Sequence, residues 1–549
     1  MMTGYWIALA AAAAQVPVAT FDWVDYRGAD ATDRVAITAD QYRNPILKGF
    51  YPDPGITRVG RDYYLVNSTF AWFPGIPVFH SRDMVTWRQI GNAIDRADQL
   101  DFATLGLSRG VFAPTIAHHA GTFYIINTCV DCGGNFIVTA RDPKGPWSKP
   151  VWLPTLAGGI DPSLFFDDDG SAWIVNNGAP EGTPRYDGHR AIWAQRFDAK
   201  TMTATGPRTV LIDGGIRPQD RPVWIEGPHI FKRDGWYYLT CAEGGTSVNH
   251  SQVVLRSRRP DGPYAIDPAN PVLTQRDLPA TRANPVTSAG HADFVTAPDG
   301  TWWAVFLATR PYAGDFYNIG RETFLLPVTW TDGWPRILPP RTPIPLVATR
   351  PVAARDPAAP PTSGAFGWRE EFDAAALPMT WMMMRQPAAR WYRTGDGMLR
   401  LTPRTQWLSD KANPSFLARR QQHLDATVTT RVRFAPRSGD RAGLAAVQND
   451  DFWYAIAVAR GAAGRVVRLS LRAGADDPAA GRVLAEAALP ATGAVDLRIA
   501  AEGARYRFGY AVGGKWRALG EAQDATPLST AKAGGFVGTM IGPFAESAR

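Results

Sequence analysis

Three acidic residues hold the same place in a repeated sequence phrase. The phrase reads Asp53-Pro54-Gly55-Ile56, Asp161-Pro162-Ser163-Leu164 and Glu226-Gly227-Pro228-His229-Ile230. The acidic residue precedes an aromatic residue (Tyr64, Trp173 or Tyr238) by 11, 12 and 12 positions. Two further copies carry no acid at the head of the phrase: Ala113-Pro114-Thr115-Ile116 and His291-Ala292-Asp293-Phe294-Val295. Offsets this regular predict that the heads of the phrases are spatially equivalent.

Carboxyl groups brought together in this way have an obvious chemistry. They cannot all ionise freely, because like charges and partial burial raise some of their pKa values. One group then keeps its proton near neutrality, and another stays ionised. Cleavage of a glycosidic bond needs this pair, an acid for the leaving oxygen and a carboxylate that activates water. The alternative is that Asp-Pro and Glu-Gly-Pro only begin strands or cap turns, but three such residues at matching positions favour a site.

The elements that would position these residues are short strands. Residues 45–335 consist of aromatic and β-branched runs bounded by Gly, Pro, Asp and Asn, which indicates an all-β region. A glycine followed by aromatics recurs five times, and the aromatic anchors Tyr64, Tyr124, Trp173, Tyr238 and Trp303 are 60, 49, 65 and 65 residues apart. This spacing suits one four-stranded sheet per repeat, so we predict a five-bladed β-propeller over residues 40–338. The heads of the phrases would begin the innermost strands and face the central channel.

A second domain follows the propeller. Residues 339–365 are rich in proline and alanine, and they are predicted to form a linker. Beyond them, alternating segments such as 426–434 and 452–459 predict an antiparallel β-sandwich over residues 366–549.

Composition excludes two classes of partner. No apolar run approaches the length that spans a bilayer, so no membrane partner is expected. The net charge of +7 comes from 58 basic and 51 acidic residues spread along the chain, without a basic cluster that could follow phosphates, so nucleic acid is not expected either. The 20 Trp, 17 Tyr and 25 Phe suit sugar-stacking surfaces as well as β-rich cores.

The N-terminus and the cysteines carry weaker signals. Residues 1–19 are interpreted as a signal peptide, because an apolar stretch ends in Ala12-Ala13-Ala14. This favours a periplasmic or secreted protein, with a cytoplasmic one as the alternative because the first basic residue is Arg27. Cys129, Cys132 and Cys241 match neither a zinc site nor a disulfide framework and are expected to be buried or incidental thiols.

Several of these segments together resemble glycoside hydrolase family 43 over nearly the whole chain. They are Asn44-Pro45-Ile46, Tyr51-Pro52-Asp53-Pro54, Asp161-Pro162-Ser163-Leu164, Glu226-Gly227-Pro228-His229 and Gly320-Arg321-Glu322-Thr323. The β-xylosidase-like branch is the most similar, because residues 413–422 resemble its C-terminal concanavalin-like β-sandwich. The resemblance implies an inverting mechanism with Asp53 as general base, Glu226 as general acid and Asp161 as the residue that tunes and orients the acid.

The resemblance also implies a set of substrate-binding residues. Phe70, Phe112, Thr246 and Arg321 are expected to line the pocket for the terminal sugar, with His291 either touching substrate or holding a metal ion. No cofactor is required, and Ca²⁺ bound in the channel at His291 is one hypothesis. Many relatives have tryptophan at the position of Phe112, which predicts a differently shaped pocket wall here.

The resulting hypothesis is an inverting exo-glycoside hydrolase, a β-xylosidase that releases xylose from the non-reducing end of xylo-oligosaccharides or arabinoxylan-derived chains. An α-L-arabinofuranosidase is the near alternative, because the two pentose rings present similar hydroxyl groups. A non-catalytic carbohydrate-binding propeller and a propeller with a retaining mechanism are two others. Assembly as a homo-oligomer is left open.

Overall fold

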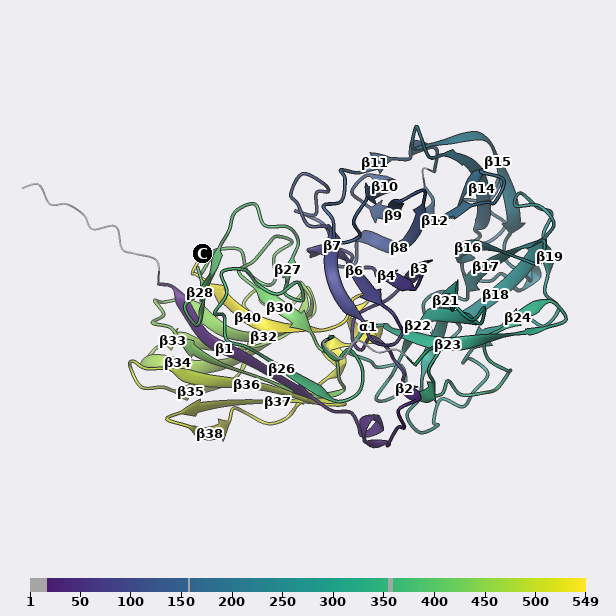
Figure 1. The fold of residues 1–549 in the computed structure, drawn as a ribbon. Coiled ribbons are helices and arrows are strands. Elements are labelled where there is room, and N and C mark those ends of the chain that lie inside the picture. The colour runs from purple at the N-terminus through teal and green to yellow at the C-terminus, as the bar shows by residue number, and fades with distance from the viewer. Residues whose placement is uncertain (1–16, 157, 354–358) are drawn as a thin grey trace, which may run out of the picture.

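The computed structural model describes residues 17–156, 158–353 and 359–549, and it contains two β-rich units (Figure 1). Most of the predicted signal peptide, residues 1–19, lies outside the described residues. Within them, no helix is both long and apolar enough to cross a bilayer. Besides strands, the described part of the chain contains only short helical turns: η1 (Ala31–Arg34), η2 (Pro154–Leu156), η3 (Pro218–Asp220), η4 (Thr526–Leu528) and α1 (Thr530–Ala533).

Five antiparallel sheets form the propeller, as the repeats predicted (Figure 1). The first blade contains β3 (Gly55–Val59), β4 (Asp62–Val66), β6 (Gly75–Ser81) and β7 (Arg88–Ile94). The second contains β8 (Gly110–His119), β9 (Thr122–Val130), β10 (Gly134–Ala140) and β11 (Val151–Trp152). The third contains β12 (Ile160–Phe166), β13 (Ala172–Gly178), β14 (Ala191–Asp198) and β15 (Thr203–Asp213). The fourth contains β16 (Glu226–Arg233), β17 (Trp236–Glu243), β18 (Ser251–Ser257) and β19 (Ala265–Ile266), with β20 (Leu273–Thr274) also on β18. The fifth contains β21 (Thr287–Thr296), β22 (Trp302–Thr309), β23 (Glu322–Thr331) and β24 (Trp334–Arg336).

The structure explains separately why the glycine and why the aromatic pair recur in every blade. In each blade the glycine makes the turn between the first two strands with a positive φ, from 65° at Gly60 to 83° at Gly300, a conformation that costs glycine little. The aromatics pack between neighbouring blades: the rings of Tyr64 and Phe123 are 4.9 Å apart, for example. The repeat therefore encodes one turn and one contact between blades.

The ring closes between the fifth and first blades. The segment before β3 hydrogen-bonds to the fifth blade, with Ile46 N donating to Thr323 O at 2.9 Å and Tyr51 N donating to Arg321 O at 3.0 Å. Next to this seam, β2 (Gln41–Arg43) pairs with β25 (Val347–Thr349), which lies in the Pro/Ala-rich segment after the propeller. This closure places Asp53 and Arg321 beside each other although they are 268 positions apart in the sequence.

The second unit is a β-sandwich of two sheets (Figure 1). One sheet has the order β28 (Tyr392–Gly395), β29 (Met398–Leu401), β1 (Ala19–Gly28), β31 (Asp425–Arg433), β36 (Val495–Glu502), β37 (Arg505–Val512) and β38 (Lys515–Ala518), with β26 (Phe366–Glu370) on β1 and β39 (Gln523–Asp524) on β37. The other has the order β35 (Arg482–Ala488), β34 (Gly464–Ala473), β33 (Phe452–Gly461), β32 (Arg441–Asn449), β40 (Met540–Glu546), β30 (Leu417–Arg420), β27 (Met382–Met384) and β5 (Trp72–Phe73).

Two strands tie the sandwich to the propeller. β1 precedes the propeller in sequence but lies within a sandwich sheet, and β5 leaves the first blade to pair with β27. A single hydrophobic core runs across this junction, where the Trp72 and Phe416 rings are 6.3 Å apart. The sandwich is therefore fixed against the first two blades rather than connected only by a linker.

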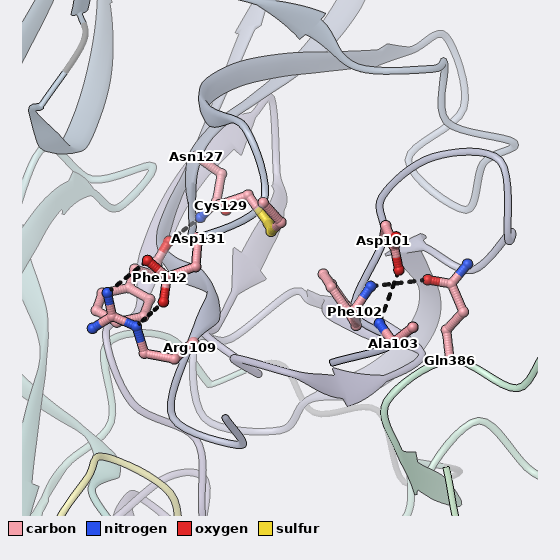
Figure 2. Close-up of a disulfide and its surroundings, with 10 residues drawn as sticks. Asp101, Phe102, Ala103, Arg109, Phe112, Asn127, Cys129, Asp131 and Gln386 are labelled. Carbon is pink, nitrogen blue, oxygen red and sulfur yellow. Dashed lines mark hydrogen bonds and ion pairs between the residues drawn. A yellow bond between two sulfur atoms is a disulfide. The ribbon is translucent and has the colours of Figure 1, made fainter. Parts of the chain in front are cut away.

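A disulfide corrects one prediction from the sequence. Cys129 and Cys132, expected to be thiols, form a disulfide at the end of the β9–β10 hairpin (Figure 2). The prediction failed because C-x-x-C was compared only with zinc sites and multi-disulfide frameworks, whereas a hairpin turn by itself brings these two residues together. Cys241 is a buried free thiol, as expected.

Candidate active site

A β-bulge marks the innermost strand of four blades at the site residues. The pairing register shifts between Phe112 and Thr115 in β8, and between Ile160 and Ser163 in β12. It shifts in the same way between Glu226 and His229 in β16, and between Gly290 and Asp293 in β21. A bulge leaves residues unpaired and re-aims their side chains, and it is common beside active sites.

The bulged residues include two of the predicted site residues. Asp161 and His291 have φ values of 51° and 55°, and Asp53, which directly precedes the first blade's inner strand, has a φ of 51°. Left-handed backbone is uncommon for residues other than glycine, and such strain concentrates at functional sites. The shared backbone conformation explains why the same short phrase, often with proline second, recurs in the sequence.

The position of Glu226 departs by one residue from the expected equivalence. Its pairing partner, Ala242, places Glu226 before the bulge, and Gly227 with φ 56° takes the place held by Asp161 in the neighbouring blade. A side chain there would meet a neighbour, because a Cβ on Gly227 would lie 2.9 Å from Nε2 of His291. The sequence offsets hid this shift because the distances to the anchors differ by one residue among the blades.

All the predicted site residues nevertheless line one pocket of about 270 Å³. They are Asp53, Asp161, Glu226, Phe70, Phe112, Thr246, His291 and Arg321. The three carboxylic residues are 5 %, 4 % and 9 % exposed in that order, so they lie deep in the pocket.

Asp53 is held by two polar neighbours. Arg321 Nη1 and Nη2 donate to its two oxygens at 2.6 and 3.4 Å, and Ser68 Oγ donates at 2.6 Å. Both contacts place donors on the Asp53 oxygens, as a carboxylate that acts as an acceptor requires. Arg321 Nε is buried and has no hydrogen-bond partner among the described residues. Asp53 is therefore suited to accept a proton.

Glu226 is in the opposite electrostatic situation. Burial, and then the negative charges of Asp161 and Asp53, raise the pKa of Glu226 to about 8. The carboxyl group consequently keeps its proton at neutral pH. Glu226 is suited to donate a proton, so the site holds one carboxyl group for each role.

Asp161 is neither clearly ionised nor clearly protonated near neutral pH. Burial, followed by the charge of Asp53, raises the pKa of Asp161 to about 7, and the hydrogen bond that Gly227 N donates to it at 3.1 Å opposes this shift. Gly227 directly follows Glu226, so this bond ties Asp161 to the backbone of the acid. Asp161 can thereby act on Glu226 both through its charge and through the position of the strand.

The pocket wall includes a residue that the sequence did not predict. Phe536, from the sandwich, stacks on Phe70 at 5.8 Å and meets Phe112 edge to face at 5.7 Å. The Arg321 guanidinium lies 5.8 Å from the Phe70 ring and 5.6 Å from the Phe536 ring. Phe536 N donates to Ser108 Oγ at 2.8 Å, which fixes the loop against the second blade. The sandwich thus supplies one side of the pocket, a role that no local motif around residue 536 indicates.

More exposed residues form the rim. Arg109, Val223, Trp224 and Gly245 line the outer part of the pocket, and none of them was predicted. Trp224 is partly exposed, and the Arg190 guanidinium lies 5.4 Å from its ring. Because exposed loop residues carry no periodic pattern, only the assembled propeller reveals that they meet.

His291 lies on the channel side of the pocket. Burial lowers the pKa of His291 to about 3, and the neighbouring His250 and His229 add to this effect, so the ring is neutral and suited to hydrogen bonding. Among residues 17–156, 158–353 and 359–549, no group of three or more His, Cys, Asp or Glu side chains is arranged to hold a metal ion. Calcium binding at His291 stays a prediction.

Comparisons with known proteins agree with this geometry. Residues 42–335 match the model of Glycosyl hydrolases family 43, and residues 369–549 match the Beta xylosidase C-terminal Concanavalin A-like domain. A xylosidase/arabinosidase of Butyrivibrio fibrisolvens is 37% identical over 92% of this chain and 95% of its own length. The non-reducing end alpha-L-arabinofuranosidase BoGH43B of Bacteroides ovatus is 35% identical over 93% and 92%. The crystal structure of a GH43_12 protein from a capybara gut metagenome superimposes with a TM-score of 0.90 at 37% identity, covering 97% of this chain and all (100%) of that one.

Proposed function

This chain belongs to glycoside hydrolase family 43, and from that premise we propose that it is an exo-acting β-xylosidase. It releases xylose from the non-reducing end of xylo-oligosaccharides or arabinoxylan-derived chains by single-step inversion. The observation that carries the proposal is that one deep pocket holds both a proton acceptor and a proton donor. Asp53 accepts hydrogen bonds from Arg321 and Ser68, and Glu226 retains its proton.

The proposed mechanism uses these residues directly. The terminal sugar enters the pocket with its ring against Phe70, Phe112 and Phe536, and Arg321, which also lines the pocket, donates to a sugar hydroxyl. The Asp53 carboxylate takes a proton from water as the water oxygen bonds to the anomeric carbon. Glu226 gives its proton to the glycosidic oxygen as the bond to that oxygen breaks. No covalent enzyme intermediate forms, and the anomeric centre inverts.

The similarity to a protein named an alpha-L-arabinofuranosidase supports a second candidate, hydrolysis of terminal arabinofuranose. An aryl β-xyloside and an aryl α-L-arabinofuranoside with the same phenol distinguish the two. We expect the higher kcat/KM on the xyloside, measured by release of the phenol under identical conditions. A higher value on the arabinofuranoside would transfer the proposal to the second candidate. Absence of turnover on both substrates, and on xylo-oligosaccharides, would contradict both candidates.

Inversion makes a stereochemical prediction. Proton NMR recorded in the first minutes of β-xyloside hydrolysis should show α-xylose before mutarotation produces the β anomer. This result follows because water attacks from the face opposite the leaving group. Initial accumulation of β-xylose would make Asp53 a nucleophile rather than a base and would favour a retaining mechanism.

The pH dependence gives a test of Asp161. Glu226 acts in its protonated form, so activity should fall as the pH rises through about 8. Because the charge of Asp161 raises the pKa of Glu226, Asp161→Asn removes that effect, and the proton is lost at lower pH. The basic limb of the kcat/KM profile should therefore move down by about one unit, the usual scale for a neighbouring charge. A limb that stays in place or moves up would show that Asp161 does not tune the acid.

We also propose that the enzyme is exported and works in the periplasm or outside the cell. The Cys129–Cys132 disulfide supports this proposal, because disulfides persist mainly in oxidising compartments. Cell fractionation of the native host followed by immunodetection tests it, and recovery of the protein only in the cytosol would contradict it.

A further inference from the structure

Arg109 lies where the pocket opens to solvent. Its side chain is 44 % exposed, whereas the three carboxylic residues deeper in the same pocket are 9 % exposed or less. A terminal sugar bound against those carboxyl groups must leave the rest of its chain in the mouth of the pocket. The sugar on the leaving-group side therefore passes the rim on which Arg109 lies.

The guanidinium of Arg109 is held in a defined plane (Figure 2). Its Nε and Nη2 donate to the two carboxylate oxygens of Asp131 at 2.6 and 3.0 Å, and the group lies 6.0 Å from the Phe112 ring. Among the described residues nothing accepts from Nη1. Arginine carries five N–H donors in a rigid fork, so one edge binds Asp131 and the other remains available to a ligand.

Asp131 is itself held by a covalent ring. It lies between Cys129 and Cys132, whose disulfide closes the end of the β9–β10 hairpin (Figure 2). Within this ring Cys132 N donates to Cys129 O at 3.3 Å, and Asp131 has a left-handed φ of 65°. An exposed ion pair usually contributes little because two long side chains must be ordered to form it. The ring orders the acidic partner in advance and lowers that cost.

We infer that Arg109 is a specificity-determining residue that hydrogen-bonds the sugar on the leaving-group side, and that the disulfide ring positions it through Asp131. The inference rests on the proposed function and deepens it. It predicts that preference for sugar leaving groups over small ones depends on Arg109. It also predicts that reducing the disulfide weakens this preference without touching Asp53 or Glu226.

The reduction step has a simple chemistry. A dithiol such as dithiothreitol transfers two electrons and two protons to the disulfide, so that Cys129 and Cys132 each become a thiol and the dithiol becomes a cyclic disulfide. Cys132 is half-buried and Cys129 is buried, so the reductant approaches through Cys132. Asp131 then lies in an open turn, and its hold on Arg109 loosens.

The test compares xylobiose, which places a sugar at the rim, with β-xylosyl fluoride, which places none there. For Arg109→Ala the ratio of kcat/KM on xylobiose to kcat/KM on the fluoride should fall about tenfold, the usual effect of losing a hydrogen bond to a charged donor. The change should appear in KM for xylobiose, because binding on the rim is shared by ground and transition states. Arg109→Lys should recover part of the ratio, and Asp131→Asn and the double variant Cys129→Ser/Cys132→Ser should each lower it by less than Arg109→Ala.

Dithiothreitol supplies the matched control. It should lower the ratio for the wild type, with reduction verified by thiol alkylation and mass spectrometry, and leave the ratio of the double serine variant unchanged. An unchanged ratio for Arg109→Ala, in a preparation whose wild type hydrolyses xylobiose, overturns the role of Arg109. An unchanged ratio for the fully reduced wild type overturns the positioning role of the ring. A wild type that hydrolyses neither substrate contradicts the proposed function instead.

Discussion

Replacing Asp53 by alanine should lower kcat/KM by about 10²–10⁴-fold, the usual contribution of a positioned base. The loss should be similar for xylobiose and for an aryl xyloside with an acidic phenol. Both reactions need the same attacking water, and the base acts on that water whatever the leaving group is. Initial rates on both substrates, with circular dichroism to verify folding, measure this effect.

Ser68→Ala provides the matched control for Asp53. It removes the hydroxyl that donates to Asp53 at 2.6 Å but keeps the carboxylate and its pairing with Arg321. We expect a loss of about tenfold, equal on both substrates, because one hydrogen bond to a charged group is lost. An Asp53→Ala variant whose loss was confined to xylobiose, or no larger than that of Ser68→Ala, would remove Asp53 from the role of base.

The propeller could be predicted from the sequence because each blade repeats the same turn and the same aromatic contact. A turn glycine such as Gly300 needs a positive φ, and aromatic residues such as Tyr64 fill the space between blades, so both recur at the period of the blade. The sandwich was readable from alternation in strands such as β31 and β33. What alternation could not show is that β1, which precedes the propeller, pairs within a sandwich sheet, because the pairing of strands that distant in sequence depends on the whole fold.

The sequence predicted those site residues that belong to the repeated phrase. The place of Asp53 and Asp161 in the phrase predicted that they face one pocket, and Glu226 lines the same pocket although it lies one residue before its expected position. Phe536 and Arg109 were missed for a different reason. They come from a sandwich loop and a rim loop, and neither segment repeats or alternates. Both residues join the pocket that the carboxyl groups line only in the assembled fold, so no local pattern records their place in it.

If Glu226 is the general acid, the loss of activity on replacing it should depend on the leaving group. Glu226→Ala should lower kcat/KM on xylobiose by about 10²–10⁴-fold or more, since a basic sugar oxygen cannot leave without a proton. On an aryl xyloside with an acidic phenol the loss should be far smaller, because that oxygen leaves as a stable anion. The basic limb of the pH profile near pH 8 should also disappear on the aryl substrate, because the group with the raised pKa is gone.

A series of aryl xylosides with phenols of increasing acidity measures this dependence: the logarithm of kcat/KM should fall more steeply with phenol pKa for Glu226→Ala than for the wild type. Glu243→Gln is the matched control, because Glu243 lies in the same blade, and burial raises its pKa to about 7, yet it lies outside the catalytic pocket. Its slope should equal that of the wild type, since a raised pKa alone does not make a catalytic acid.

If Glu226→Ala slowed every substrate by one factor while Asp53→Ala showed the steep slope, the roles of acid and base would have to be exchanged. If both variants kept full activity, the chemistry would lie outside the pocket that Asp53 and Glu226 line.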